Sequence, residues 1–320
     1  MNLSLEDLAR DNEAVLFVGV GGGGDVSWSI PLISYLRTLG VKRFAVGEAA
    51  IAWWDLEGQI SLGGFTFHLK DLDRSQALSD RCALLHKDTR VATGHGKGSK
   101  LPQCIIAEMK DVEAFVFELD SGVKGITNSM DALTKHLGAG LVIGVDCGSD
   151  SFYSGTETKV LSPLVDAMVV AALADCKQAS VMGLIGYGCD GDLMPDELDA
   201  SVKQVIRKGG LLGARGLTQS DVREMEEFFK IWPNPVEEWP LKAAKGELGW
   251  KNMNTLWSIL VTPLTSIMMF FDPKVLVEHN PLAREVRGST DLKEAEEATI
   301  RLGLMPETRM AKLLPKLMEE

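Results

Sequence analysis

Short apolar runs, loops of glycine and aspartate, and helical patterns follow one another repeatedly along this chain. The apolar runs are rich in β-branched residues and are expected to form strands at residues 14–20, 43–47, 114–119, 141–145 and 181–186. Helical patterns are found at residues 26–39, 122–136, 161–174 and 196–208. This alternation predicts a parallel sheet with helices packed on its faces. The nearly continuous apolar character of the strands indicates that both faces of the sheet are buried.

We therefore predict an α/β protein with a Rossmann-like, doubly wound, mainly parallel sheet in a three-layer αβα arrangement. The 320 residues fit a single α/β domain (1–320), with its core at about 12–220 and an extension at about 221–320 packed on it. Two segments interrupt the alternation. Residues 58–69 favour a hairpin that leaves the sheet, and residues 231–249 favour an ordered surface loop or flap.

Charge and composition limit the partners that this chain can have. The formal net charge of −12 argues against nucleic acid, because binding to phosphates needs a basic face. The most apolar stretch, residues 256–271, contains Pro263 and is too short to span a bilayer, so no membrane partner is expected. The N-terminus is unlike a signal peptide, and the five cysteines are scattered without CxxC spacing. We expect a cytoplasmic protein with a small-molecule substrate, and homo-oligomer formation is left open.

The first predicted strand ends in four glycines and an aspartate: Gly21, Gly22, Gly23, Gly24 and Asp25. Glycines here let the backbone approach a ligand closely and leave amide groups free at a helix N-terminus. A carboxylate repels a bare phosphate, so Asp25 suggests a bridging cation, a ribose hydroxyl or a substrate ammonium group. The structural alternative is a tight turn in which Asp25 caps the following helix.

Two later strands also end in loops that combine acids with glycines. The residues of interest after 141–145 are Asp146, Gly148, Asp150 and Glu157. Those after 181–186 are Gly188, Asp190 and Asp192. Carboxylate oxygens in such loops suit hard cations, although caps and turns use the same residue types.

In a doubly wound sheet, the loops after neighbouring strands meet in one crevice, where ligands bind. Several carboxylates in one crevice repel each other unless a cation bridges them or one acid keeps its proton. We therefore expect Mg²⁺ or Mn²⁺, held by some of Asp25, Asp146, Asp150, Glu157, Asp190 and Asp192. The candidates for catalytic groups are Asp146, Asp150 and Asp25.

A basic, glycine-rich segment at residues 93–100 contains Lys97, Ser99 and Lys100. It lacks the GxxxxGK[ST] spacing of a Walker A motif, but its side chains suit a loop that closes over phosphate. We expect these residues, the four glycines of the first loop, and Gly148 and Gly188 to contact a bound cofactor, for which a nucleotide is a candidate. The structural alternative is a mobile surface loop.

The number of acids favours an enzyme over a binding module, because metal-assisted chemistry needs several carboxylates and anion binding does not. We expect a metal-assisted enzyme that acts on a phosphorylated or nucleotide-like small molecule at the C-terminal edge of the sheet. Transferase, hydrolase and lyase chemistry are not distinguished. One alternative is a non-catalytic module that binds a nucleotide or metabolite. Another is a metal-dependent lyase or cyclase for an amino or hydroxy acid, in which the lysine loop is incidental.

The motifs are also distinctive as a set. They are Gly21–Val26, Asp146–Asp150 with Glu157 and Ser162–Ala167, Thr262–Thr265 with Phe270–Pro273, and Asn280–Arg284. In this order, they resemble the mainly archaeal family catalogued as domain of unknown function 1152. Where the family pattern has a second glycine in the VDxGGD motif, this chain has Ser149. The resemblance implies the α/β fold and the site, and it implies no particular reaction.

Overall fold

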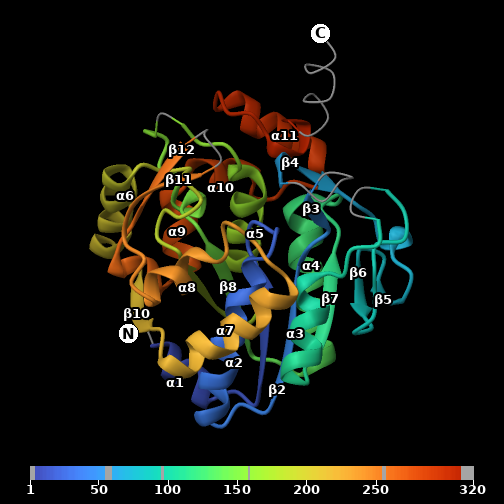
Figure 1. The fold of residues 1–320 in the computed structure, drawn as a ribbon. Coiled ribbons are helices and arrows are strands. Elements are labelled where there is room, and N and C mark those ends of the chain that lie inside the picture. The colour runs from blue at the N-terminus through green and yellow to red at the C-terminus, as the bar shows by residue number, and fades with distance from the viewer. Residues whose placement is uncertain (1–3, 55–59, 95–96, 158, 254–256, 311–320) are drawn as a thin grey trace.

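A nine-stranded sheet, parallel at its centre, organises the chain (Figure 1). The computed structural model describes residues 4–54, 60–94, 97–157, 159–253 and 257–310. The parallel strands are β1 (Ala14–Gly19), β2 (Arg43–Ala49), β7 (Glu113–Phe117), β8 (Leu141–Cys147) and β9 (Ala179–Ile185). Their order across the sheet is β9-β8-β1-β2-β7, so the chain runs outward from β1 first in one direction and then in the other. This reversal places a topological switch point between β1 and β8.

Antiparallel strands extend the sheet at both sides. Next to β7 lie β6 (Cys82–Leu85) and then β5 (Ser75–Ser79). Beyond β9, strand β13 (Ile267–Phe271) is inserted antiparallel between β9 and β10 (Leu211–Gly216). The extension predicted at about 221–320 therefore contributes β13 to the sheet itself.

Helices cover both faces of the sheet. Those with residues in one core cluster are α4 (Gly122–Leu137), α5 (Pro163–Asp175), α6 (Pro195–Arg207), α9 (Pro273–His279), α10 (Pro281–Val286) and α11 (Leu292–Arg301). Those with residues in the other are α1 (Leu5–Arg10), α2 (Ser29–Thr38), α3 (Pro102–Lys110), α7 (Gln219–Ile231) and α8 (Trp239–Ala244). Strand β1 contributes Leu16 and Val18 to the first cluster and Val15 and Phe17 to the second, because successive side chains point to opposite faces. The predicted three-layer, mainly parallel fold is confirmed.

Two hairpins stand apart from the main sheet. One pairs β3 (Ile51–Trp54) with β4 (Ile60–Thr66), where residues 58–69 predict a hairpin; residues 58 and 59 lie outside the described part. The other pairs β11 (Gly249–Met253) with β12 (Trp257–Val261). No helix in the described ranges is long and apolar enough to cross a membrane.

The segment at residues 231–249 is ordered, as expected, and includes helix α8. It packs on the glycine-rich loop after β1. The side-chain amide of Asn234 donates to the carbonyl of Gly23 (2.9 Å), and the indole of Trp28 donates to the carbonyl of Glu237 (3.1 Å). The loop between α7 and α8 therefore covers one side of the C-terminal end of β1.

Candidate functional site

The loops after β1 and β8 are joined at the switch point. Asp25 begins a short 3₁₀ helix (Asp25–Trp28) directly after the four glycines. Its Oδ2 accepts from the amide of Gly21 (2.6 Å), and its Oδ1 accepts from the amide of Cys147 (3.0 Å). One carboxylate thus closes its own loop and connects that loop to the end of β8.

The loop after β9 joins the same group. The amide of Gly188 donates to the carbonyl of Gly148 (3.0 Å). Ser149 donates to Asp190 from its backbone amide (2.9 Å) and from its hydroxyl (2.7 Å). A Cβ atom on Gly148 would lie 2.5 Å from Asp190 Oδ2, so glycine is required for this contact. All three aspartate-bearing loops therefore lie together at one edge of the sheet.

Three buried aspartates come together at this edge: Asp25, Asp146 and Asp166. Each offers a carboxylate oxygen, and these oxygens all lie within 4.8 Å of one another. The side chains are only 5%, 2% and 3% exposed, respectively. Asp146 accepts a hydrogen bond from the hydroxyl of Ser151, whereas Oδ1 of Asp166 has no hydrogen-bond partner in the described part of the chain. We call these residues the first carboxylate group.

Asp150, Asp190 and Asp192 form a second carboxylate group beside the first, again with oxygens within 4.8 Å of one another. These acids are more fully engaged with the loops. Asp192 accepts from the backbone amides of Leu161 (3.2 Å) and Ser162 (3.1 Å). The hydroxyl of Ser162 lies 2.7 Å from Asp192 Oδ2 and 3.1 Å from Asp150 Oδ2. Much of the second group is therefore explained by hydrogen bonds that fix the loops.

Burial is the main cause of the raised pKa values in both groups. It raises the pKa of Asp25 and of Asp190 to about 8, and hydrogen bonds from backbone amides or Ser149 oppose this rise. Burial, followed by the charges of neighbouring acids, raises the pKa values of Asp146, Asp150 and Asp166 well above the ordinary range. The largest charge effects on all of these groups come from other acids. Such a site either keeps protons or takes up cations.

Four buried acids at this edge are absent from the set predicted from sequence: Asp166, Glu48, Glu237 and Glu307. Glu307 accepts from the backbone amides of Leu164 (3.1 Å) and Val165 (2.7 Å), next to Asp166. Asp166 lies in the first turn of α5 and is the one charged residue in the otherwise apolar stretch 163–174, which is a signal that sequence alone carries. Glu48 stands near the end of the buried strand β2, and burial raises its pKa to about 8. Glu237 belongs to the segment over the glycine loop, and one oxygen of Glu48 and one of Glu237 lack a hydrogen-bond partner among the described residues. No sequence pattern marks Glu237.

The glycine loop is occupied by contacts within the protein. The amide of Gly21 binds Asp25, and that of Gly24 binds Glu48. A Cβ atom at Gly22 would meet Ile51 at 2.4 Å, one at Gly23 would meet Trp53 at 2.5 Å, and one at Gly24 would meet Trp232 at 2.2 Å. The glycines therefore permit close packing of β3 and of the segment at 231–249 on this loop.

Other predicted site residues lie outside the two carboxylate groups. Glu157 accepts from the backbone amides of its own turn, residues 154–156, at 2.9 to 3.0 Å. Lys100 is paired with Glu108 (2.7 Å), and Lys97 and Ser99 are exposed. Residues 95 and 96 of that segment lie outside the described part. None of the contacts given for these side chains reaches an acid of either group.

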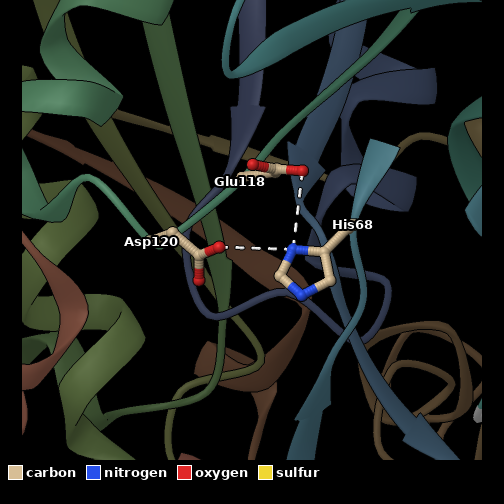
Figure 2. A group of neighbouring side chains, drawn as sticks. All are labelled: His68, Glu118 and Asp120. Atoms are coloured by element: carbon tan, nitrogen blue, oxygen red, sulfur yellow. Dashed lines mark ion pairs between the residues drawn. The ribbon is translucent and has the colours of Figure 1, made fainter. Parts of the chain in front are cut away.

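A third cluster, at the end of β7, pairs its acids with basic side chains (Figure 2). His68 Nδ1 lies 3.2 Å from Asp120 Oδ2 and 3.6 Å from Glu118 Oε1. Arg81 adds ion pairs to Glu118 (2.7 Å) and Asp120 (3.6 Å). Here the acids have basic partners, so their arrangement is explained without a metal ion.

The comparison with known proteins gives a family and no function. No curated protein and no solved structure matches the chain. The family model described as "Protein of unknown function (DUF1152)" matches residues 16–314, a span that contains every acid of both carboxylate groups. The resemblance expected from the motifs is confirmed, and the chain belongs to the DUF1152 family.

Proposed function

We propose that this protein is a metal-dependent enzyme that acts on a phosphorylated or nucleotide-like small molecule at the carboxyl ends of its parallel strands. The observation that carries the proposal is the first carboxylate group, Asp25, Asp146 and Asp166, with its oxygens within 4.8 Å of one another. Among the described residues, Oδ1 of Asp166 is buried without a hydrogen-bond partner. A buried polar atom without a partner is costly, and a bound cation removes that cost.

Retained protons are the other way to reduce repulsion in this group. Protonation lowers the charge, but Oδ1 of Asp166 then gains a partner only where a neighbouring protonated carboxyl group donates to it. A cation both neutralises the carboxylates and provides that oxygen with a ligand bond. All the donors are oxygens, which favours Mg²⁺ or Mn²⁺ over softer metals.

The position and hydrogen bonds of each acid indicate its role. Asp25, Asp146 and Asp166 hold the cation, which supplies charge stabilisation for a substrate oxygen or an activated water. Asp150 is the candidate proton acceptor. It lies beside this group and is hydrogen-bonded to the side chains of Ser162 and Asp192, whereas Asp192 is also bound by two backbone amides. A less constrained carboxylate is better able to accept a proton from substrate or water.

Position and charge together support a phosphorylated substrate. Ligands of doubly wound sheets bind at the switch point, which here lies between β1 and β8. A phosphate enters such an acidic crevice together with Mg²⁺, which commonly binds substrate phosphates through one or two carboxylates. A second candidate is a metal-dependent lyase or cyclase for an amino or hydroxy acid. This candidate is favoured by the ion pair between Lys100 and Glu108, because a lysine that is already paired is less able to bind a phosphate.

The proposal is tested by screening phosphorylated metabolites, nucleotides, amino acids and hydroxy acids for turnover with Mg²⁺, with Mn²⁺ and with EDTA. We expect turnover of a phosphorylated compound only with metal. Asp150→Asn should reduce it by about 10²–10⁴-fold, as for loss of a catalytic acid or base, and Asp146→Asn should also reduce it, through loss of a metal ligand. Glu157→Gln is the matched control, because Glu157 binds only its own turn among the contacts given for it. Turnover that survives EDTA, or that Asp146→Asn leaves unchanged, contradicts the proposal.

A further inference from the structure

A pocket of about 120 Å³ lies between the loop after β9 and strand β12. On the loop side its walls include Tyr187, Gly188 and Gly191. On the other side they include Ser258 and Leu260 of the strand. None of its wall residues belongs to either carboxylate group.

The pocket and the second carboxylate group share one short loop. Asp190 lies between the two wall residues Gly188 and Gly191, and Asp192 follows directly. The backbone amide of the wall residue Leu193 donates to the hydroxyl of Ser149 (3.1 Å), which itself donates to Asp190. Consecutive Cα atoms are about 3.8 Å apart, so the wall residues Gly188 and Gly191 lie within about 8 Å of Asp190. The distance between the pocket wall and these acids is therefore within the length of one small molecule.

The size and lining of the pocket define what fits there. An apolar cavity of about 150 Å³ is known to bind benzene, so 120 Å³ accommodates about one ring. Apolar wall residues such as Leu193 and Leu260 suit the faces of a ring, and the hydroxyls of Ser258 and Thr262 suit polar atoms at its edge. The phenol of Tyr187 is held by Asp199 (2.7 Å), which fixes an aromatic ring in the wall. A nucleobase matches this lining, because it has flat faces and polar atoms at its edge.

We infer that this pocket binds the base of a nucleotide whose phosphate is bound by a cation at the first carboxylate group, which we call the metal centre. The inference rests on the proposed function and narrows its substrate class to nucleotides. The loop after β9 then performs two tasks. Its Asp190 accepts from Ser149 in the loop that follows Asp146, and its glycines and Tyr187 form a wall for the base.

The test compares two probes that differ in the base, uridine monophosphate and ribose 5-phosphate, by calorimetry in the presence of Mg²⁺. The wild-type protein should bind uridine monophosphate about tenfold more tightly, since stacking of a base contributes roughly 1–3 kcal/mol. Leu264→Trp and Met194→Trp place a large ring at the pocket, and both positions are exposed, so folding should be retained. Each should abolish the difference between the probes. Leu248→Trp is the matched control, because Leu248 is similarly exposed and is not part of the pocket wall.

Equal affinity of the wild-type protein for the two probes overturns the inference, as does an equal loss of the difference in Leu248→Trp. Mg²⁺ titrated alone reports separately on the metal centre. If Mg²⁺ does not bind, but uridine monophosphate is still preferred and the pocket variants abolish this preference, the proposed function is wrong and the base pocket stands. If Mg²⁺ binds and neither probe is preferred, the metal centre stands and the base pocket is wrong.

Discussion

The carboxylate of Asp25 accepts a hydrogen bond from the backbone amide of Cys147 across 3.0 Å, although 122 residues separate the two in the chain. This contact connects the ends of β1 and β8, the strands between which the chain reverses direction in the sheet. It also holds Asp25 beside Asp146, the neighbour of Cys147. The candidate site is therefore built into the topology of the fold.

The stability of the metal-free protein should fall as pH rises from about 4 to about 8. In the folded state the pKa of Asp25 is raised from 3.8 to about 8, and that of Glu48 from 4.5 to about 8. The folded protein therefore retains protons that the unfolded chain has lost in this range, and stability decreases as they are removed. Urea unfolding in EDTA across this range measures the effect. A rise in stability with pH contradicts it.

Mg²⁺ should stabilise the protein more at pH 8 than at pH 6. At the lower pH the cation competes with protons on Asp25 and its neighbours, because metal ligands bind in their deprotonated form. At saturating concentrations of about 100 Kd, a ligand that binds only the folded state adds about 2.7 kcal/mol. The same urea series with Mg²⁺ measures this, and an equal gain at both pH values counts against a proton-linked metal site.

Gly21→Ala should damage the metal centre by steric conflict alone. The added Cβ atom would lie 2.5 Å from Oδ2 of Asp166 and 3.1 Å from Oδ2 of Asp25. Displaced carboxylates should weaken Mg²⁺ binding by about 10- to 100-fold, a range typical of disturbed ligand positions. Gly216→Ala is the control, since nothing lies within 4 Å of a Cβ atom there. Calorimetric Mg²⁺ affinity that is the same in both variants rules out the predicted arrangement.

Asp192→Ala should reduce stability rather than metal affinity. The side chain of Asp192 accepts from the backbone amides of Leu161 and Ser162 and from the hydroxyl of Ser162. Without these acceptors, unfolding should require about 1–3 kcal/mol less free energy. Urea unfolding and Mg²⁺ calorimetry on one preparation test both effects. A variant of unchanged stability that binds Mg²⁺ poorly would instead make the second carboxylate group the metal site.

The sheet and its acidic edge were predictable because both are encoded locally. Apolar runs define the buried strands. Asp146 lies at the end of one such run, and Asp25 and Asp190 lie in the glycine-containing loops that follow two others. Parallel pairing then brings their loops to one edge, as doubly wound topology requires. Ser149, at the position where the family pattern has glycine, uses its amide and hydroxyl to hold Asp190.

The residues that sequence did not reveal depend on tertiary packing. Asp166 lies on a helix, and only the packing of α5 against the sheet brings it to Asp25 and Asp146. Strand β13 lies far along the chain from β9, and its insertion beside β9 is a long-range pairing that local pattern does not specify. Glu157 carries the same local signal as the site acids, yet it binds its own turn. Local chemistry alone does not distinguish a ligand from a cap.

Calorimetric titration of Mn²⁺ into the wild-type protein and Asp166→Asn at pH 8 tests the metal centre most directly. Asp166 belongs to the first carboxylate group and has an unpartnered buried oxygen, so its charge should matter for the metal more than for folding. We expect the wild-type protein to bind Mn²⁺ and the variant to bind it about 10- to 100-fold more weakly or worse. The variant's metal-free unfolding free energy should equal or exceed that of the wild type, because one source of repulsion is removed. Equal Mn²⁺ affinity in the two proteins, or no binding to either, would contradict the assignment of a metal centre to Asp25, Asp146 and Asp166.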